Sequence, residues 1–70
     1  MKRQTFVDKL EEQGYQVFAV EDGIAIYDTF GWRAFVSDKV RYGINTCGLQ
    51  LPTDDFNAII RYSRTPLEKR

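Results

Sequence analysis

The strongest constraint on the fold of this chain is a pair of closely spaced turns within residues 14–37. An apolar run over residues 15–20 is followed by Asp22 and Gly23, and a second apolar run over residues 24–28 begins immediately afterwards. An Asp-Gly pair between two such runs predicts a β-hairpin with a type I′ turn, in which Gly23 has a positive φ. These residues therefore predict two antiparallel strands joined by a two-residue turn.

A third strand is expected over residues 32–37, after a three-residue loop that ends in Gly31. The two turn lengths predict that Asp28 pairs with Val17 on one side and with Trp32 on the other. Side chains alternate across a sheet, so the turns also assign its two faces. One face is expected to carry Val17, Ala19, Ile24, Ile26, Trp32, Ala34 and Val36. The opposite face is expected to carry Phe18, Val20, Ala25, Tyr27, Arg33 and Phe35.

The sequence before the first strand predicts an amphipathic helix over residues 2–13. Gly14 supplies a left-handed residue that ends this helix. Thr5 and Asp8 form an alternative capping box, which would start the helix later. The apolar side of the helix consists of Phe6, Val7 and Leu10.

A second helix is predicted over residues 53–64. Thr53 is a suitable N-cap, and the acidic residues that follow it suit the positive end of the helix dipole. Pro66 forces the preceding residue out of helical geometry and stops the helix near Arg64. The inward stripe is expected to contain Phe56, Ile59, Ile60 and Ser63.

The remaining segments complete an α-β-β-β-(β)-α order. Residues 40–45 predict a short fourth strand at an edge of the sheet, and residues 67–70 are expected to form a short tail. The chain is expected to be one α+β domain over residues 1–70, with a three- to four-stranded antiparallel sheet and two helices on one face. Its most buried residues are expected to be Phe6, Leu10, Val17, Ile24, Ile26, Val36, Phe56, Ile59 and Ile60.

Composition limits the classes of function. Ten Lys and Arg residues balance ten Asp and Glu residues, so the chain lacks the positive charge of a generic nucleic-acid or anionic-membrane binder. Cys47 is the only cysteine, which rules out an internal disulfide and favours a reducing compartment. No apolar run has the length of a transmembrane helix or signal-peptide core. We therefore expect a small cytoplasmic protein.

Residues suited to catalysis or metal binding are few. The chain has no histidine, so Cys47 would lack the usual base of a cysteine nucleophile. Each pair of neighbouring acidic residues fits a helix face, a turn or a helix start, and the glycines fit turns. Asp28 is expected to accept hydrogen bonds from the backbone of the following loop. We expect no catalytic residue, no metal and no cofactor, and we interpret the protein as a non-enzyme.

Two stretches carry a family resemblance. Residues 24–28 (Ile-Ala-Ile-Tyr-Asp) precede Gly31, and residues 61–70 read Arg-Tyr-Ser-Arg-Thr-Pro-Leu-Glu-Lys-Arg. With residues 14–17 and 34–37, they resemble uncharacterised short proteins encoded in phages and prophages of Gram-positive bacteria. The C-terminal stretch is similar to a Tyr-Ala-x-Thr-Pro-Leu-Glu-Glu-Arg ending, from which this chain departs at Ser63, Arg64 and Lys69. The resemblance implies a phage origin, a bacterial host cell and a similar fold, but no functional residues.

The second apolar face of the sheet is the candidate interaction surface, because two helices of this size cover only one face. It comprises Phe18, Val20, Ala25, Tyr27, Arg33 and Phe35. We expect it to bind a protein, either a second copy in a homodimer or a host or phage protein.

Two alternatives to this interpretation remain open. The aromatic residues of the face, with the basic residues near the C-terminus, would suit single-stranded nucleic acid. In the other alternative, the connector over residues 46–52 folds back over the face, with Leu49 and Leu51 filling it.

Overall fold

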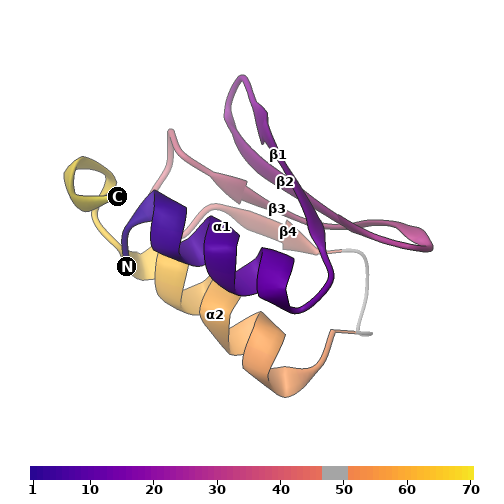
Figure 1. The fold of residues 1–70 in the computed structure, drawn as a ribbon. Helices are drawn as coiled ribbons and strands as arrows, with labels where there is room; N and C mark the ends of the chain where they lie inside the picture. Colours follow the sequence, from indigo (N-terminus) through magenta and orange to yellow (C-terminus); the bar gives the residue numbers. More distant parts are fainter. Residues whose placement is uncertain (47–50) are drawn as a thin grey trace.

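The computed structural model describes residues 1–46 and 51–70, and it confirms the predicted α+β fold (Figure 1). The elements are α1 (Arg3–Glu12), β1 (Gln16–Val20), β2 (Gly23–Asp28), β3 (Gly31–Ser37), β4 (Ile44–Thr46), α2 (Thr53–Arg64) and a 3₁₀ turn, η1 (Leu67–Lys69). The strands form one antiparallel sheet in the order β1-β2-β3-β4. Both helices lie side by side against the same face of this sheet, as predicted. Cys47 and Leu49 lie outside the described residues.

Helix α1 has the predicted end. Gly14 has a φ of +95°, and its position directly after the last helical turn makes it the left-handed residue that ends the helix. The helix begins at Arg3, so the alternative start at Thr5 is wrong. Its fully buried side chains are Phe6 and Leu10.

Helix α2 has the predicted bounds but a different start. Pro52 occupies the N-cap position, no side chain caps the helix, and Thr53 is its first residue, so the predicted capping role of Thr53 is wrong. Acidic residues still occupy the first turn, where the helix dipole favours negative charge.

The turn between β1 and β2 lies one residue earlier than predicted. It consists of residues 21–22 (Glu-Asp), and Val20 pairs with Gly23 across it. Val17 pairs with Ile26, which is two residues from its predicted partner. Because side chains alternate with a period of two, a shift of two residues leaves each side chain on its predicted face.

Gly23 lies within β2, and its conformation differs from the prediction. Among the described glycines, Gly14 and Gly31 have positive φ and Gly23 does not, so the predicted type I′ turn is wrong. Glycine is needed at this position for another reason. A Cβ atom here would lie 2.1 Å from the carbonyl oxygen of Val36 and 3.0 Å from the ring of Phe35. The close approach of β3, rather than a turn conformation, therefore excludes a side chain.

The β2–β3 hairpin keeps the predicted register away from its turn. Ile24 pairs with Val36, and Ile26 pairs with Ala34, as predicted. All four side chains are buried beneath the helices. This confirms the predicted assignment of the helix-covered face in the centre of the sheet.

A β-bulge changes the pairing near the β2–β3 turn. Trp32 lies opposite Tyr27, Gly31 lies opposite Asp28, and Arg33 is the residue that the bulge inserts into β3. The loop holds two residues rather than three, because Gly31 is already the first residue of β3. Gly31 has a φ of +127°. Direct cross-strand partners share a face, so Trp32 lies with Tyr27 on the face opposite the helices. The predicted pairing of Trp32 with Asp28, and its place beneath the helices, are therefore wrong.

The fourth strand lies at an edge of the sheet, as predicted, but it is shorter and begins later. Val40 and Tyr42 were expected within it, yet they lie in a turn and are 61% and 60% exposed. The hydroxyl oxygen of Ser37 accepts hydrogen bonds from the backbone N–H groups of Lys39 (3.0 Å) and Val40 (2.9 Å). Such local bonds compete with strand pairing and hold the chain in the turn.

The core lies between the sheet and the two helices, and its composition partly differs from the prediction. Its fully buried cluster consists of Phe6, Leu10, Ile24, Ile26, Ala34, Val36, Ile59 and Tyr62. Phe56 is 38% exposed, so its predicted burial is wrong. Val17 and Ile60 are only half-buried.

The difference arises because α2 turns another side toward the sheet. Its buried residues are Asp55, Ala58, Ile59, Tyr62 and Ser63. These positions follow helical spacing, but polar side chains among them conceal the pattern in the sequence. The ring of Tyr62 stacks on Phe6, with 4.3 Å between the ring centroids. The buried side thus keeps the predicted Ile59 and Ser63, but Asp55, Ala58 and Tyr62 take the places expected for Phe56 and Ile60.

The last residues are fixed to the fold rather than forming the expected tail. The side chain of Arg70 is only 5% exposed, and its Nη1 binds Asp38 Oδ1 at 3.0 Å and also donates to the carbonyl oxygen of Ser37. Its Nη2 and Nε donate to the carbonyl oxygens of Ser63 and Thr65, at 3.0 and 3.1 Å. Arg70 therefore joins the end of β3 to the end of α2.

Candidate functional site

The sheet face opposite the helices carries the residues predicted to form an interaction surface (Figure 1). Ile24 and Ile26 point into the helix-covered core, so their neighbours along β2 point the other way. The pairing between strands adds the residues opposite them. We call this surface the outer face; it consists of Phe18, Val20, Ala25, Tyr27, Trp32 and Phe35.

Aromatic side chains shield the centre of the outer face. Phe18 and Phe35 are the direct partners of Ala25 on either side, and Ala25 is 7% exposed. The rings of Phe18 and Tyr27 meet edge to face, with 5.5 Å between their centroids. Phe18 nevertheless remains 49% exposed, and Val20 remains 45% exposed. The face therefore has a packed centre and an apolar margin at β1 that stays in contact with water.

Arg33 binds the hairpin end that borders the outer face. Its Nε lies 2.5 Å from Oδ2 of Asp28, and the two side chains are each about one-quarter or less exposed. The other carboxylate oxygen of Asp28 accepts a 2.7 Å hydrogen bond from the backbone N–H of Phe30, which confirms its predicted role in the loop. The hydrogen bond from Arg33 is the main cause that lowers the pKa of Asp28 below its usual value. Arg33, predicted as part of the interaction surface, is thus bound to the turn.

A second polar contact ties the start of β1 to α2. The hydroxyl of Tyr15 donates a 2.7 Å hydrogen bond to Oδ2 of Asp55. Burial, this hydrogen bond and the nearby carboxylates raise the pKa of Tyr15 to about 12. The sequence contained no signal for this pair, because the two residues are forty positions apart.

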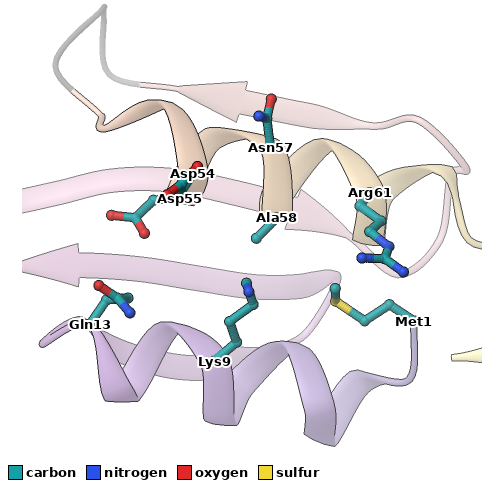
Figure 2. Close-up of a pocket in the computed structure, with 8 residues that line it drawn as sticks. All are labelled: Met1, Lys9, Gln13, Asp54, Asp55, Asn57, Ala58 and Arg61. Carbon is teal, nitrogen blue, oxygen red and sulfur yellow. The ribbon is translucent and has the colours of Figure 1, made fainter.

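A groove of about 310 Å³ runs between α1 and α2 (Figure 2). It is lined by Met1, Lys9, Gln13, Asp54, Asp55, Asn57, Ala58 and Arg61. Lys9 projects from α1 toward α2, and Arg61 projects from the opposite wall. Asp54 and Asp55 lie together at one end of this groove and Arg61 lies toward the other end, with Lys9 between them; the lining residues include no nucleophile paired with a base. Its chemistry is that of two solvated helix faces.

The connector over residues 46–52 was the alternative cover for the outer face, and its described residue Leu51 lies on the other side of the sheet. Leu51 is half-buried and packs against the core cluster beneath the helices. Its predicted place over the outer face is therefore wrong. Leu49, the other residue of that alternative, lies outside the described residues.

Comparison with protein-family models, curated proteins and solved structures found no match. Within residues 1–46 and 51–70, no three His, Cys, Asp or Glu side chains gather in a group that could hold a metal ion. Neither helix in this part of the chain has the length and apolar character needed to cross a membrane.

Proposed function

We propose that this protein is a non-enzymatic protein-interaction module that binds a second copy of itself, or a host or phage protein, through the outer face. The observation that carries the proposal is the exposure of Phe18 and Val20 beside the packed rings of Tyr27 and Phe35. No element among the described residues covers this face of the sheet. Grouped apolar side chains on an open sheet face are typical of surfaces that bind other proteins.

Aromatic residues suit such a surface because they bury a large area with few rotatable bonds. A Phe or Tyr side chain buries on the order of 150–250 Å² when it enters an interface. Phe18 is already oriented by its edge-to-face contact with Tyr27, so its ordering on binding costs little conformational entropy. We infer that Phe18 is the central contact of the surface.

Single-stranded nucleic acid is the second candidate, and the location of the charges disfavours it. Stacked bases need cations beside the aromatic rings that hold them. Arg61 and Arg64 belong to α2, which packs on the other face of the sheet. Arg70 is buried against Asp38, and Arg3 lies 3.6 Å from the same carboxylate. The basic residues near the C-terminus therefore lie away from the aromatic residues of the outer face, and Arg33, which borders this face, is bound to Asp28.

From the motif resemblance, we infer that this module acts in the cytoplasm of a bacterial cell that carries a phage or prophage. The single cysteine fits a reducing compartment. The proposed role does not involve a metal, a cofactor or catalysis.

The proposal is tested by replacing outer-face aromatics and measuring association. Phe18→Ser combined with Phe35→Ser removes two rings from the face, and sedimentation velocity over micromolar concentrations reports self-association. Phe30→Ser is the matched control, because Phe30 is 87% exposed in the β2–β3 loop and lies outside the face. We expect the double variant to lose association while remaining folded, and the control to behave as wild type.

Two outcomes would contradict the proposal. If the wild-type protein is monomeric and the double variant mainly lowers the melting temperature, the face is part of the core and the proposal is wrong. If single-stranded oligonucleotide binds with a strong salt dependence that Arg61→Gln and Arg64→Gln remove, the second candidate replaces it.

A further inference from the structure

Strand β1 forms an open edge of the sheet. In the part of the chain that the structure describes, it pairs with β2 alone. Its sequence, Gln-Val-Phe-Ala-Val, contains no charged residue and no proline, and four of its five residues are exposed. Soluble proteins usually protect such an edge with lysine, proline, a bulge or a covering segment. β1 has none of the first three, whereas β4, at the other edge, spans only three residues.

Alternate N–H and C=O groups of β1 point toward the open edge, where they can pair with another strand. The ladder closes with the pair of Val20 and Gly23 across a two-residue loop, and this pair exchanges hydrogen bonds. Bonding then alternates along the strand, so Phe18 also bonds to β2. The N–H and C=O groups of Val17 and Ala19 point away from β2, toward the open edge.

We propose that a second copy of this chain pairs with β1 in antiparallel orientation, so that two four-stranded sheets join into one of eight strands. This inference deepens the proposed function and rests on it, because it names the partner and the geometry of binding. Full overlap of the two strands places Phe18 opposite Phe18 of the second copy. Val17 then exchanges backbone hydrogen bonds with Ala19 in both directions, using the groups that point outward.

The side chains suit this register on both faces. On the outer face, the two half-exposed Phe18 rings become direct cross-strand neighbours, and the two outer faces become continuous. On the helix side, Ala19 borders a hollow of about 250 Å³. The hollow is lined by Arg3, Gln4, Val7, Val17, Ala19 and Ile24. It leaves space for Val17 of the second copy beside the small side chain of Ala19.

The backbone step of the proposal is tested by Ala19→Pro. Proline lacks the N–H that points to the open edge, and it is tolerated on edge strands where that group faces water. Sedimentation velocity should show a concentration-dependent dimer for the wild type and a monomer for Ala19→Pro. Thr46→Pro, at the last position of the opposite edge strand, is the control and should still dimerise, because Thr46 is in a non-hydrogen-bonded pair with Ala34 and its N–H points away from β3. Circular dichroism establishes that each variant is folded.

The register is tested by disulfide cross-linking. Phe18→Cys in a Cys47→Ser background gives each chain one thiol, and the two thiols face each other across the twofold axis. Direct partners in such a pair have Cβ atoms about 4.5–5.5 Å apart, close to the reach of a disulfide. Val20→Cys in the same background is the matched control, since four residues separate the two positions along the paired strands, or about 13 Å. Under mild oxidation, Phe18→Cys should form a covalent dimer and Val20→Cys should not.

The outcomes separate this inference from the proposed function. If Ala19→Pro still dimerises while the outer-face double variant does not, the copies meet face to face, and the edge proposal is wrong although the face binds. If Ala19→Pro abolishes the dimer and Phe35→Ser does not, the edge pairs without help from the face. A monomeric wild type that gives no Phe18→Cys cross-link overturns the edge proposal. If Ala19→Pro fails to fold, the cross-link alone decides.

Discussion

The guanidinium of Arg70 lies over the ring of Tyr62, with its Cζ atom 4.6 Å from the ring centroid, and both side chains bind the same oxygen of Asp38. The hydroxyl of Tyr62 donates to Asp38 Oδ1 at 2.8 Å, and Nη1 of Arg70 does so at 3.0 Å. Because Tyr62 also stacks on Phe6 of α1, this contact connects α1, α2, the end of β3 and the last residue. One polar cluster beside the core therefore holds the two helices, the end of β3 and the last residue together.

Arg70→Met should destabilise the protein. The variant keeps much of the side-chain volume but removes a buried charge that binds one carboxylate and three carbonyl oxygens. Asp38 remains partly exposed, so we expect a loss of about 3 kcal/mol, near the low end for broken buried ion pairs. Lys69→Met is the control and should change stability by less than about 0.5 kcal/mol. Urea unfolding measures both, and equal midpoints would contradict the role of Arg70.

Stability should decrease at alkaline pH because of the buried tyrosines. Burial and the hydrogen bond to Asp38 raise the pKa of Tyr62 from 10.0 to about 12. Its contribution is fully present below the unfolded pKa and is lost as the pH rises from about 10 to 12. Tyr62→Phe should be less stable than wild type at pH 7 and should show a smaller further loss between pH 10 and 12. Parallel wild-type and variant curves over this range would argue against the assignment.

Asp28 should contribute stability in the opposite pH direction. Its folded pKa is lowered, chiefly by Arg33, so its contribution is present above the unfolded pKa of about 4 and is lost as the pH falls through the folded value. Asp28→Asn should therefore lower the melting temperature at pH 7 and have a smaller effect near pH 2. Thermal unfolding across this range, with the exposed Asp22→Asn as control, measures the difference. A difference that is independent of pH would assign the effect of Asp28 to shape rather than charge.

Ile26 should be among the most sensitive core positions. Its side chain is fully buried between the sheet and the helices, so Ile26→Ala should cost roughly 2–5 kcal/mol. A single core of this size supplies only about 3–5 kcal/mol, so the variant should be close to unfolded at 25 °C. Val20→Ala on the outer face removes apolar surface that is already half exposed and should cost much less. An Ile26→Ala protein with the same melting temperature as the wild type would show that the assignment of the buried and outer faces is reversed.

Gly14, which precedes β1, and Gly23, which begins β2, should differ in their tolerance of alanine. Gly14 has a positive φ but open space around it, so Gly14→Ala should cost on the order of 1–2 kcal/mol from backbone strain alone. At Gly23, a Cβ atom meets the carbonyl oxygen of Val36, and the two strands must separate to accept it. Gly23→Ala should therefore cost more than Gly14→Ala, and Gly23→Val more again. Chemical denaturation of the three variants tests this ranking. A Gly23→Val protein as stable as the wild type would contradict the close approach of the Val36 carbonyl to Gly23.

The sequence predicted the layers and faces of the fold because these depend on local periodicity. Alternation placed Ile24 and Ile26 beneath the helices, and Phe18 and Tyr27 on the outer face. The turn position depends on a contact with a third strand, since Gly23 is required by the approach of Val36. A local reading of the Asp-Gly pair contains no information about that strand.

The polar contacts of the structure were less predictable than its apolar layers. The sequence predicts only a short tail around Arg70, because its partners Asp38 and Ser63 become neighbours only in the folded chain. The burial of Tyr62 depends on the same contacts. The bulge at Arg33 follows from loop closure between Asp28 and Gly31, which strand periodicity does not encode. Folding brings these residues together; spacing along the sequence does not reveal them.

The narrow space beside Gly23 also selects the alignment of β2 on β3. If β2 slid along β3 by two residues, the faces would be preserved, but Ala25 or Glu21 would occupy this space, and its Cβ atom would collide with the Val36 carbonyl. A slide by one residue would turn Ile24 and Ile26 toward water. Both nearest misalignments are therefore disfavoured. The two-residue slide is disfavoured because only glycine, which has no Cβ atom, fits beside the Val36 carbonyl. The two-residue slide is thus opposed by a contact between two strands, whereas the one-residue slide is opposed by the core that both helices complete.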